Sequence, residues 1–201
     1  MAIELDQEFP GLRAEWRRCI CSDNRCDAGV GERLDTLASR FSGRQAIELR
    51  QQQIPAAYRS FYRQIGIDPD LEPTHVEQAA LSRLLAGGNR QSDRISDALL
   101  LALLETSVPV FAFEAAAVAP PVEIRQALAG ELAGGSDLPP GTLILADRER
   151  ALCQLFEQPD VAMAVTGTGA EILLVAVAVP GVSAIASDEA LTIAAEAISG
   201  S

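Results

Sequence analysis

Arginine and tyrosine side chains gather between residues 40 and 63, where five arginines occur with a single acidic residue. Arg59 and Arg63 are four residues apart and therefore share one face of a helix, beside Tyr58 and Tyr62. Guanidinium groups bind phosphate, and aromatic rings stack on unpaired bases. This spacing indicates a surface that contacts RNA. In the alternative interpretation, the rings belong to the core and both arginines line a solvated flank.

Arg125 and Glu131 form a second candidate pair. A guanidinium can hold the carboxylate of a bound amino acid while a carboxylate holds its ammonium group. The two side chains can equally pair with each other or with surface partners. Asp97 lies in an otherwise apolar helix, where a buried carboxylate needs a partner. It is therefore either a further binding residue or a structural cap or pair.

Three other polar residues have ordinary structural explanations. Glu77 follows Thr74 by three residues, which is the spacing of a capping box at a helix start. Asp147 is typical of a turn. His75 is the single histidine and would suit a general base for ester hydrolysis. Its place just inside a helix start favours ordinary exposure instead.

Cys19, Cys21 and Cys26 lie close enough in sequence to suggest a metal site. A closed zinc site needs a fourth ligand, and the other candidates, Cys153 and His75, are distant in sequence. We therefore expect buried or loop thiols, no metal and no other cofactor.

Hydrophobic periodicity predicts a single α+β domain over residues 1–201. A helix-rich lobe spans about 30–107. A strand-rich lobe with a mixed or antiparallel sheet spans about 108–201 and also includes the N-terminal strands at 2–21. The predicted helices are 30–40, 45–52, 56–65, 74–85, 92–106 and 188–198. The predicted strands after residue 107 are 110–113, 122–126, 142–146, 151–156, 161–166 and 171–179.

The charge is acidic overall and uneven along the chain. The net charge is −12, and all 16 basic residues are arginine. Residues 1–100 carry 13 arginines against 15 acids, whereas residues 101–201 carry 3 against 13. An acidic protein repels phosphate at long range, so DNA is not expected as a partner and any RNA contact must come from the first half. No leader or membrane span is recognisable, which favours a soluble cytoplasmic protein.

Residues 58–70 read Tyr-Arg-Ser-Phe-Tyr-Arg-Gln-Ile-Gly-Ile-Asp-Pro-Asp, and a Pro-Thr-x-x-Glu helix start follows at 73–77. This segment resembles the B-three/B-four tRNA-binding and editing module of the phenylalanyl-tRNA synthetase beta subunit. Further pieces follow in the family's order, so that the resemblance covers roughly 55–175. They are Arg83 with Gly87, Asp97, Val108-Pro109-Val110, residues 124–127 with Gly130-Glu131, and Leu143 to Asp147.

The resemblance implies a B-three/B-four-like α+β fold that recognises an aminoacyl-tRNA or an amino acid. It implies that Asp97, Arg125 and Glu131 line the substrate pocket and that Arg59 and Arg63 face the RNA.

This chain also departs from the family. Asp93 and Leu100 stand where the family has asparagine, and the loop after Glu131 is shorter. The catalytic modules of a complete synthetase cannot fit in 201 residues, which excludes aminoacylation. Trans-editing of mischarged aminoacyl-tRNA is the sharper expectation. The alternative is a non-catalytic protein that binds an amino-acid-like small molecule.

Overall fold

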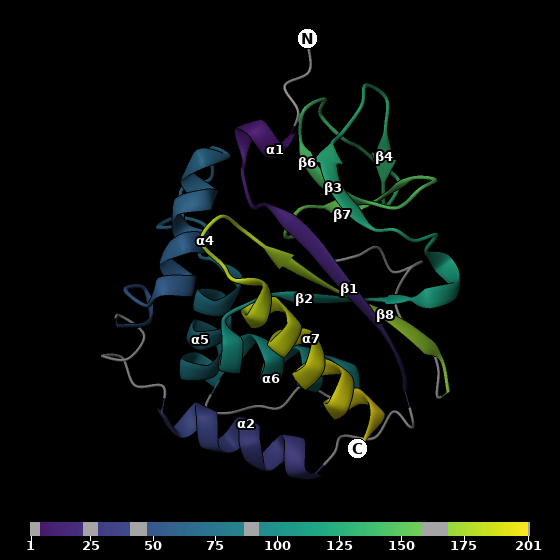
Figure 1. Cartoon of the computed structure of the whole chain (residues 1–201). Coiled ribbons are helices and arrows are strands. Elements are labelled where there is room, and N and C mark those ends of the chain that lie inside the picture. Colours follow the sequence, from purple (N-terminus) through teal and green to yellow (C-terminus); the bar gives the residue numbers. More distant parts are fainter. Residues whose placement is uncertain (1–4, 22–27, 41–47, 87–92, 158–168, 201) are drawn as a thin grey trace.

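The computed structural model describes residues 5–21, 28–40, 48–86, 93–157 and 169–200, which form an α+β protein with antiparallel sheets (Figure 1). The helices are α1 (Leu5–Glu8), α2 (Ala28–Arg40), α4 (Gln53–Gln64), α5 (His75–Ala86), α6 (Arg94–Thr106) and α7 (Ala184–Ser199). The strands are β1 (Arg13–Ile20), β2 (Val110–Glu114), β3 (Glu123–Gln126), β4 (Leu132–Ala133), β5 (Ser136–Asp137), β6 (Leu143–Ala146), β7 (Ala151–Gln154) and β8 (Glu171–Ala178). None of the helices in these ranges is long and apolar enough to cross a membrane.

Strand β8 is the centre of the main sheet, with β1 on one side and β2 on the other. Its run from Ile172 to Ala178 is apolar throughout and fully buried, as expected for a strand covered on both faces. Helix α7 packs on β1 and β8, and α6 packs on α7 (Figure 1). Arg17 ties β1 to α7, because its guanidinium donates to Thr192 Oγ1 and Asp188 Oδ1, each at 2.7 Å. The long apolar strand therefore anchors the core.

A second sheet, in the order β3-β6-β7, lies beside the β4–β5 hairpin above the main sheet in Figure 1. All of β6 is buried. Phe156 follows β7 and packs its ring against Tyr62 of α4, at 5.1 Å between centroids. It also lies 5.7 Å from the ring of His75 at the start of α5. The second sheet is thereby joined to the helices through aromatic side chains.

The helix starts are set by local polar side chains. At α5, the carboxylate of Glu77 accepts from Thr74 N at 3.1 Å, which confirms the capping-box interpretation. At α6, Asp93 Oδ1 accepts from Ser96 N at 2.8 Å. Each bond satisfies a backbone donor that the first helical turn leaves free.

Several predicted elements differ from the structure. Leu5 begins helix α1 rather than lying in a strand, because the chain closes a helical turn with Phe9 N donating to Leu5 O at 2.8 Å. Helix α7 begins at Ala184, four residues before the predicted start, because Ser183 Oγ accepts from Ala186 N at 3.2 Å. Residues 50–52 form a turn and a bend rather than the end of a helix. Among the residues outside the described ranges are Ile3, Cys26, Gly87 and the predicted strand 161–166.

Candidate functional site

Three arginines of the first half meet in an arginine cluster, which is formed by Arg50, Arg59, Arg63, Asp70 and Glu77. Arg59 is at its centre and is only 7% exposed. Its guanidinium donates to Glu77 Oε1 at 2.7 Å, to the Pro69 carbonyl at 3.2 Å and to Asp70. The expectation that Arg59 faces RNA is therefore not met by the geometry, because this side chain is turned inward onto carboxylates.

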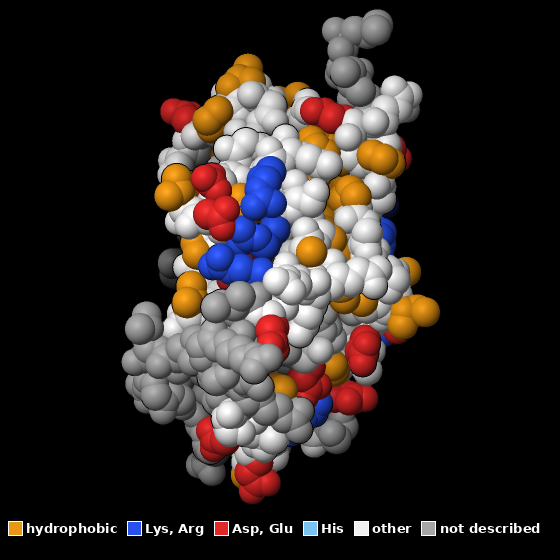
Figure 2. Space-filling view, turned by 90° about the vertical axis from the view of Figure 1, so that its left-hand side faces the viewer, with side chains coloured by type: hydrophobic (Ala, Val, Ile, Leu, Met, Phe, Trp, Pro, Cys, Tyr) orange, Lys and Arg blue, Asp and Glu red, His pale blue; other side chains and the backbone are white. Residues whose placement is uncertain are grey.

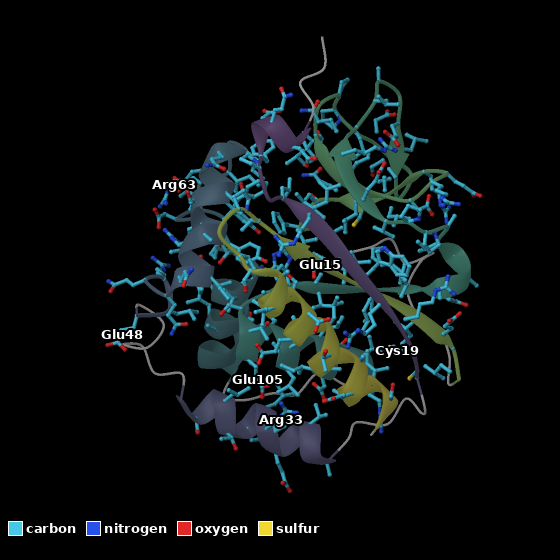
Figure 3. All side chains as sticks on the ribbon, viewed as in Figure 1. Glu15, Cys19, Arg33, Glu48, Arg63 and Glu105 are labelled. Atoms are coloured by element: carbon cyan, nitrogen blue, oxygen red, sulfur yellow. The ribbon has the colours of Figure 1, made fainter. Side chains whose placement is uncertain are left out.

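Arg50 and Arg63 form the solvent-facing part of the arginine cluster. Arg50 Nε lies 2.8 Å from Glu77 Oε1, and Arg63 Nη2 lies 3.5 Å from Asp70 Oδ2. About half of each arginine side chain is accessible to solvent. Figure 2 shows arginine side chains as a continuous basic stripe on this face of the molecule, with acidic side chains at its border. Figure 3 places Arg63 on the outer side of α4.

Asp70 is the point on which the three guanidinium groups converge. Its carboxylate pairs with Arg59, with Arg63 at 3.5 Å and with Arg50 at 3.7 Å. The hydrogen bond from Arg59, reinforced by the other positive charges, lowers the pKa of Asp70 below its usual value. The cluster thus holds one exposed carboxylate, that of Asp70, among three guanidinium groups.

The aromatic side chains of α4 are core residues. Tyr58, Phe61 and Tyr62 are at most 5% exposed, so their rings are unavailable for stacking on bases. The alternative interpretation of these rings is confirmed, whereas the solvated position expected for both arginines holds for Arg63 alone.

Arg125 and Glu131 pair with each other, which was the second of the two alternatives. Arg125 Nη1 donates to Glu131 Oε2 at 2.8 Å, and Nη2 donates to Oε1. Glu131 Oε2 also accepts from Leu128 N at 2.9 Å. This fork-to-carboxylate geometry closes the loop between β3 and β4. The hydrogen bonds from Arg125, followed by that from Leu128, lower the pKa of Glu131 to about 2.

Asp97 is buried at 1% exposure in α6. Helix α6 packs against α7, α2, α5 and β2, and it lies below the main sheet in Figure 1, whereas β3 lies above it. The structure therefore does not bring Asp97 together with Arg125 and Glu131. The pocket that the resemblance implied is not assembled from these three side chains.

The bonds between Arg125 and Glu131 predict how the stability of the protein depends on pH. Because the pKa of Glu131 falls from 4.5 to about 2 on folding, its stabilisation is complete above pH 4.5 and is lost as pH falls toward 2. We expect Glu131→Gln to destabilise the protein by roughly 1 kcal/mol at pH 7, a value reduced by solvent screening. Thermal unfolding should show the difference from wild type shrinking between pH 4.5 and 2. Glu149→Gln, at an exposed turn residue, is the control. A difference that is constant over this range would contradict the assignment.

His75 is held between rings rather than exposed. Its ring lies 5.7 Å from the rings of Phe111 and Phe156, and Nδ1 is 3.2 Å from the Tyr62 hydroxyl. Burial lowers its pKa, and a hydrogen bond with the Phe156 backbone only partly offsets this. His75 is therefore a packing residue, and its burial favours the neutral imidazole.

Asp147 and the three cysteines in the described ranges follow their structural interpretations. Asp147 Oδ1 accepts from the backbone of Glu149 and Arg150, which confirms the turn. Cys19, Cys21 and Cys153 are buried in the hydrophobic core. Burial raises the pKa of Cys19 to about 11 and that of Cys153 to about 12. In the described ranges, no group of three or more His, Cys, Asp or Glu side chains is arranged to hold a metal ion.

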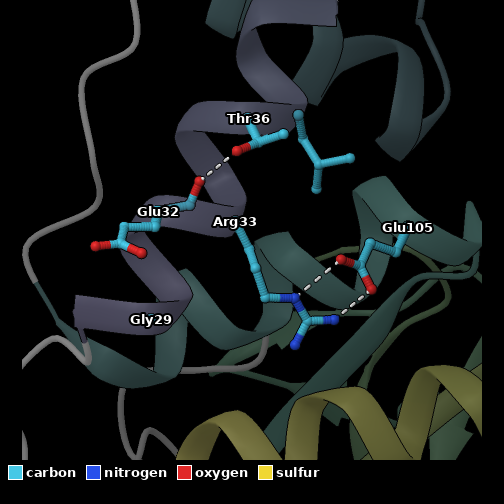
Figure 4. Close-up of a pocket in the computed structure, with 6 residues that line it drawn as sticks. Gly29, Glu32, Arg33, Thr36 and Glu105 are labelled. Atoms are coloured by element: carbon cyan, nitrogen blue, oxygen red, sulfur yellow. Dashed lines mark hydrogen bonds and ion pairs between the residues drawn. The ribbon is translucent and has the colours of Figure 1, made fainter.

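Sequence reasoning missed a hollow of about 330 Å³ between α2 and the end of α6. Figure 4 shows Arg33 and Glu105 pointing toward one another across it. Arg33 Nε and Nη2 donate to the Glu105 carboxylate at 3.2 and 2.7 Å. Glu32, Thr36 and Leu37 also line the hollow. No local pattern could have revealed it, because Arg33 and Glu105 are 72 residues apart.

Comparison with known proteins identifies no family for this chain. No protein-family model matches the chain, and a search of curated proteins returned no relative.

Proposed function

We propose that this chain is a tRNA-binding module with a B-three/B-four-like fold, and that Arg50 and Arg63 contact the RNA backbone. The convergence of three guanidinium groups on the exposed carboxylate of Asp70 carries the proposal. A phosphate presents oxygens much as a carboxylate does and is bound by the same arginine fork. Asp70 then occupies, in the free protein, the position that a backbone phosphate takes in the complex.

The charge of the arginine cluster supports an RNA contact at this surface, although the protein as a whole is acidic. The arginine cluster holds three positive and two negative side chains, while the whole chain carries a net charge of −12. Arg59 acts as a positioning residue, because its bonds hold Asp70 and Glu77 in place. These are the two acids that the exposed side chains of Arg50 and Arg63 also contact. Of the two arginines that the sequence predicts at the RNA, the proposed contact therefore keeps Arg63 and replaces Arg59 by Arg50.

A second candidate function is the binding of an amino-acid-like small molecule without catalysis. The hollow between α2 and α6 favours it, because Arg33 matches a carboxylate while Glu32 and Glu105 match an ammonium group. Leu37 supplies an apolar contact for a side chain. A ligand would have to compete with the existing Arg33–Glu105 pair, so the arginine cluster remains the favoured site.

The test measures binding of fluorescently labelled tRNA by anisotropy at several salt concentrations. We expect Arg63→Ala to weaken binding several-fold and to reduce the slope of log K against log salt by about 1, since one phosphate contact is lost. Arg148→Ala, at an exposed arginine in the β6–β7 turn, is the matched control and should change neither quantity. Equal effects of the two variants, or no binding by wild type at low salt, would refute the proposal.

The same complex separates recognition from editing. With tRNA-Phe mischarged with tyrosine, loss of the ester faster than in buffer would identify a trans-editing enzyme. Binding without faster hydrolysis would identify recognition alone. If only a free amino acid binds, with little dependence on salt, the second candidate function is the correct one.

A further inference from the structure

The outer edge of β1 is a surface for which the tRNA-binding function has no use. Strand β1 pairs with β8 on one side, and no other strand of the described ranges pairs with its second side. Figure 1 shows β1 running across the front of the molecule. Trp16 and Ile20 on this strand are exposed by 41% and 61%. A strand edge with exposed apolar side chains is a template for pairing with another chain.

The hydrogen-bonding pattern identifies the groups that this edge offers. Cys21 N, directly after β1, donates to Ala170 O at 3.1 Å, in register with the β1–β8 pairing. Residues of an antiparallel ladder alternate between directing both backbone groups toward the partner strand and directing both away from it. Odd-numbered residues of β1 therefore bond to β8. Ala14, Trp16, Arg18 and Ile20 direct their N–H and C=O groups outward.

We propose that this edge pairs antiparallel with β1 of a second copy of the chain, about a two-fold axis at Trp16. In this register the two Trp16 side chains lie opposite each other, and Ala14 of each copy lies opposite Arg18 of the other. Glu15 lies opposite Arg17 of the other copy, and the symmetry makes this pair twice. Opposite charges in directly facing positions stabilise an antiparallel pair.

Charge also excludes the two adjacent registers. An axis at Arg17 would place the two Arg17 side chains directly opposite each other, and an axis at Glu15 would do the same with the two Glu15 side chains, which is destabilising in both cases. All three registers match the outward-facing backbone groups, so the side chains choose among them. The present partners leave room for the new contact, because Glu15 and Arg17 keep 26% and 37% of their side-chain surface exposed while bound to Arg13 and Asp188.

Charge reversal on one strand gives a specific test by sedimentation velocity. We expect wild type to form dimers as its concentration rises to about 0.5 mM, the range in which small interfaces associate. Glu15→Arg alone and Arg17→Glu alone should remain monomeric, because each places two pairs of like charges at the interface. An equimolar mixture of the two variants should dimerise again, since every facing pair then has opposite charge. Unfolding of a variant would not produce this rescue.

Trp16 supplies an independent reading, because it is the only tryptophan. Its quenching by acrylamide should fall as wild type dimerises. Arg18→Pro, which removes an outward N–H while sparing the bonds to β8, should abolish that change. A monomeric wild type at 0.5 mM would overturn the proposal. So would dimers that persist in both single charge variants, since these would use another surface.

Discussion

Replacing Glu77 by alanine should destabilise the protein by about 3 kcal/mol or more, since breaking a buried ion pair costs roughly 3–5 kcal/mol. Glu77 is 2% exposed. Its Oε1 accepts from Arg59 Nη1 at 2.7 Å and lies 2.8 Å from Arg50 Nε. Its Oε2 accepts from the N and Oγ1 of Thr74 at 3.1 and 2.9 Å. The substitution therefore removes a helix cap and leaves the buried Arg59 bonded to Asp70 and the Pro69 carbonyl.

Chemical denaturation of Glu77→Ala and Glu72→Ala measures the effect. Glu72 is an exposed acid just before the same helix, and its loss should change the free energy of unfolding by no more than about 0.5 kcal/mol. Replacing both charges, as in Arg59→Met with Glu77→Gln, should cost less than Glu77→Ala alone, because no buried charge then lacks its partner. Equal stability of the Glu77 and Glu72 variants would show that the buried pair is not a stabilising element.

The α+β class and most elements could be predicted because local patterns decided them. The unbroken apolar run of β8 has no helical or alternating polar positions, so burial on both faces was the remaining solution. The Thr74–Glu77 spacing predicted the start of α5 to within one residue. The start of α7 was missed, because Ala184 to Ser187 carries no charged signal and the effective cap, Ser183, is one small hydroxyl.

The position of Arg59 could not be predicted from periodicity. The apolar stripe of α4 contains Tyr58 and Tyr62, and Arg59 lies at the border of that stripe, where a helical side chain can turn either way. Its partners decided the outcome, and Asp70 and Glu77 are 11 and 18 residues away on a loop and another helix. The same limit applies to Arg33 and Glu105, whose meeting depends on how α2 packs against α6.

The Arg125–Glu131 pair was predictable only as one of two alternatives. Their separation of six residues permits both a mutual bond and a shared ligand, and residue type alone favours neither. The closeness of β3 to the following loop makes the mutual bond available without a ligand. The position of Asp97 depends on the order of the layers, which no motif in the sequence specifies.

Phe156→Ala should destabilise the protein by about 3–4 kcal/mol, in the range of large-to-small substitutions at buried aromatic residues. The ring is 8% exposed, and its centroid lies 5.1 Å from Tyr62, 5.7 Å from His75 and 6.0 Å from both Tyr58 and Phe61. It is also the aromatic side chain that joins the second sheet to α4 and α5. Its removal opens a cavity between these elements and removes edge-to-face ring contacts.

The backbone at Phe156 supplies the discriminating control. Its φ is +70°, a left-handed conformation that is unfavourable for a phenylalanine or an alanine. Glycine adopts it freely because it has no Cβ. Phe156→Gly loses the same ring as Phe156→Ala but relieves this strain, so it should be more stable than Phe156→Ala by up to about 1 kcal/mol. In ordinary helix or strand positions the order is the reverse. Denaturation of the two variants in parallel decides the matter, and an alanine variant as stable as the glycine variant would mean that the left-handed conformation is not retained.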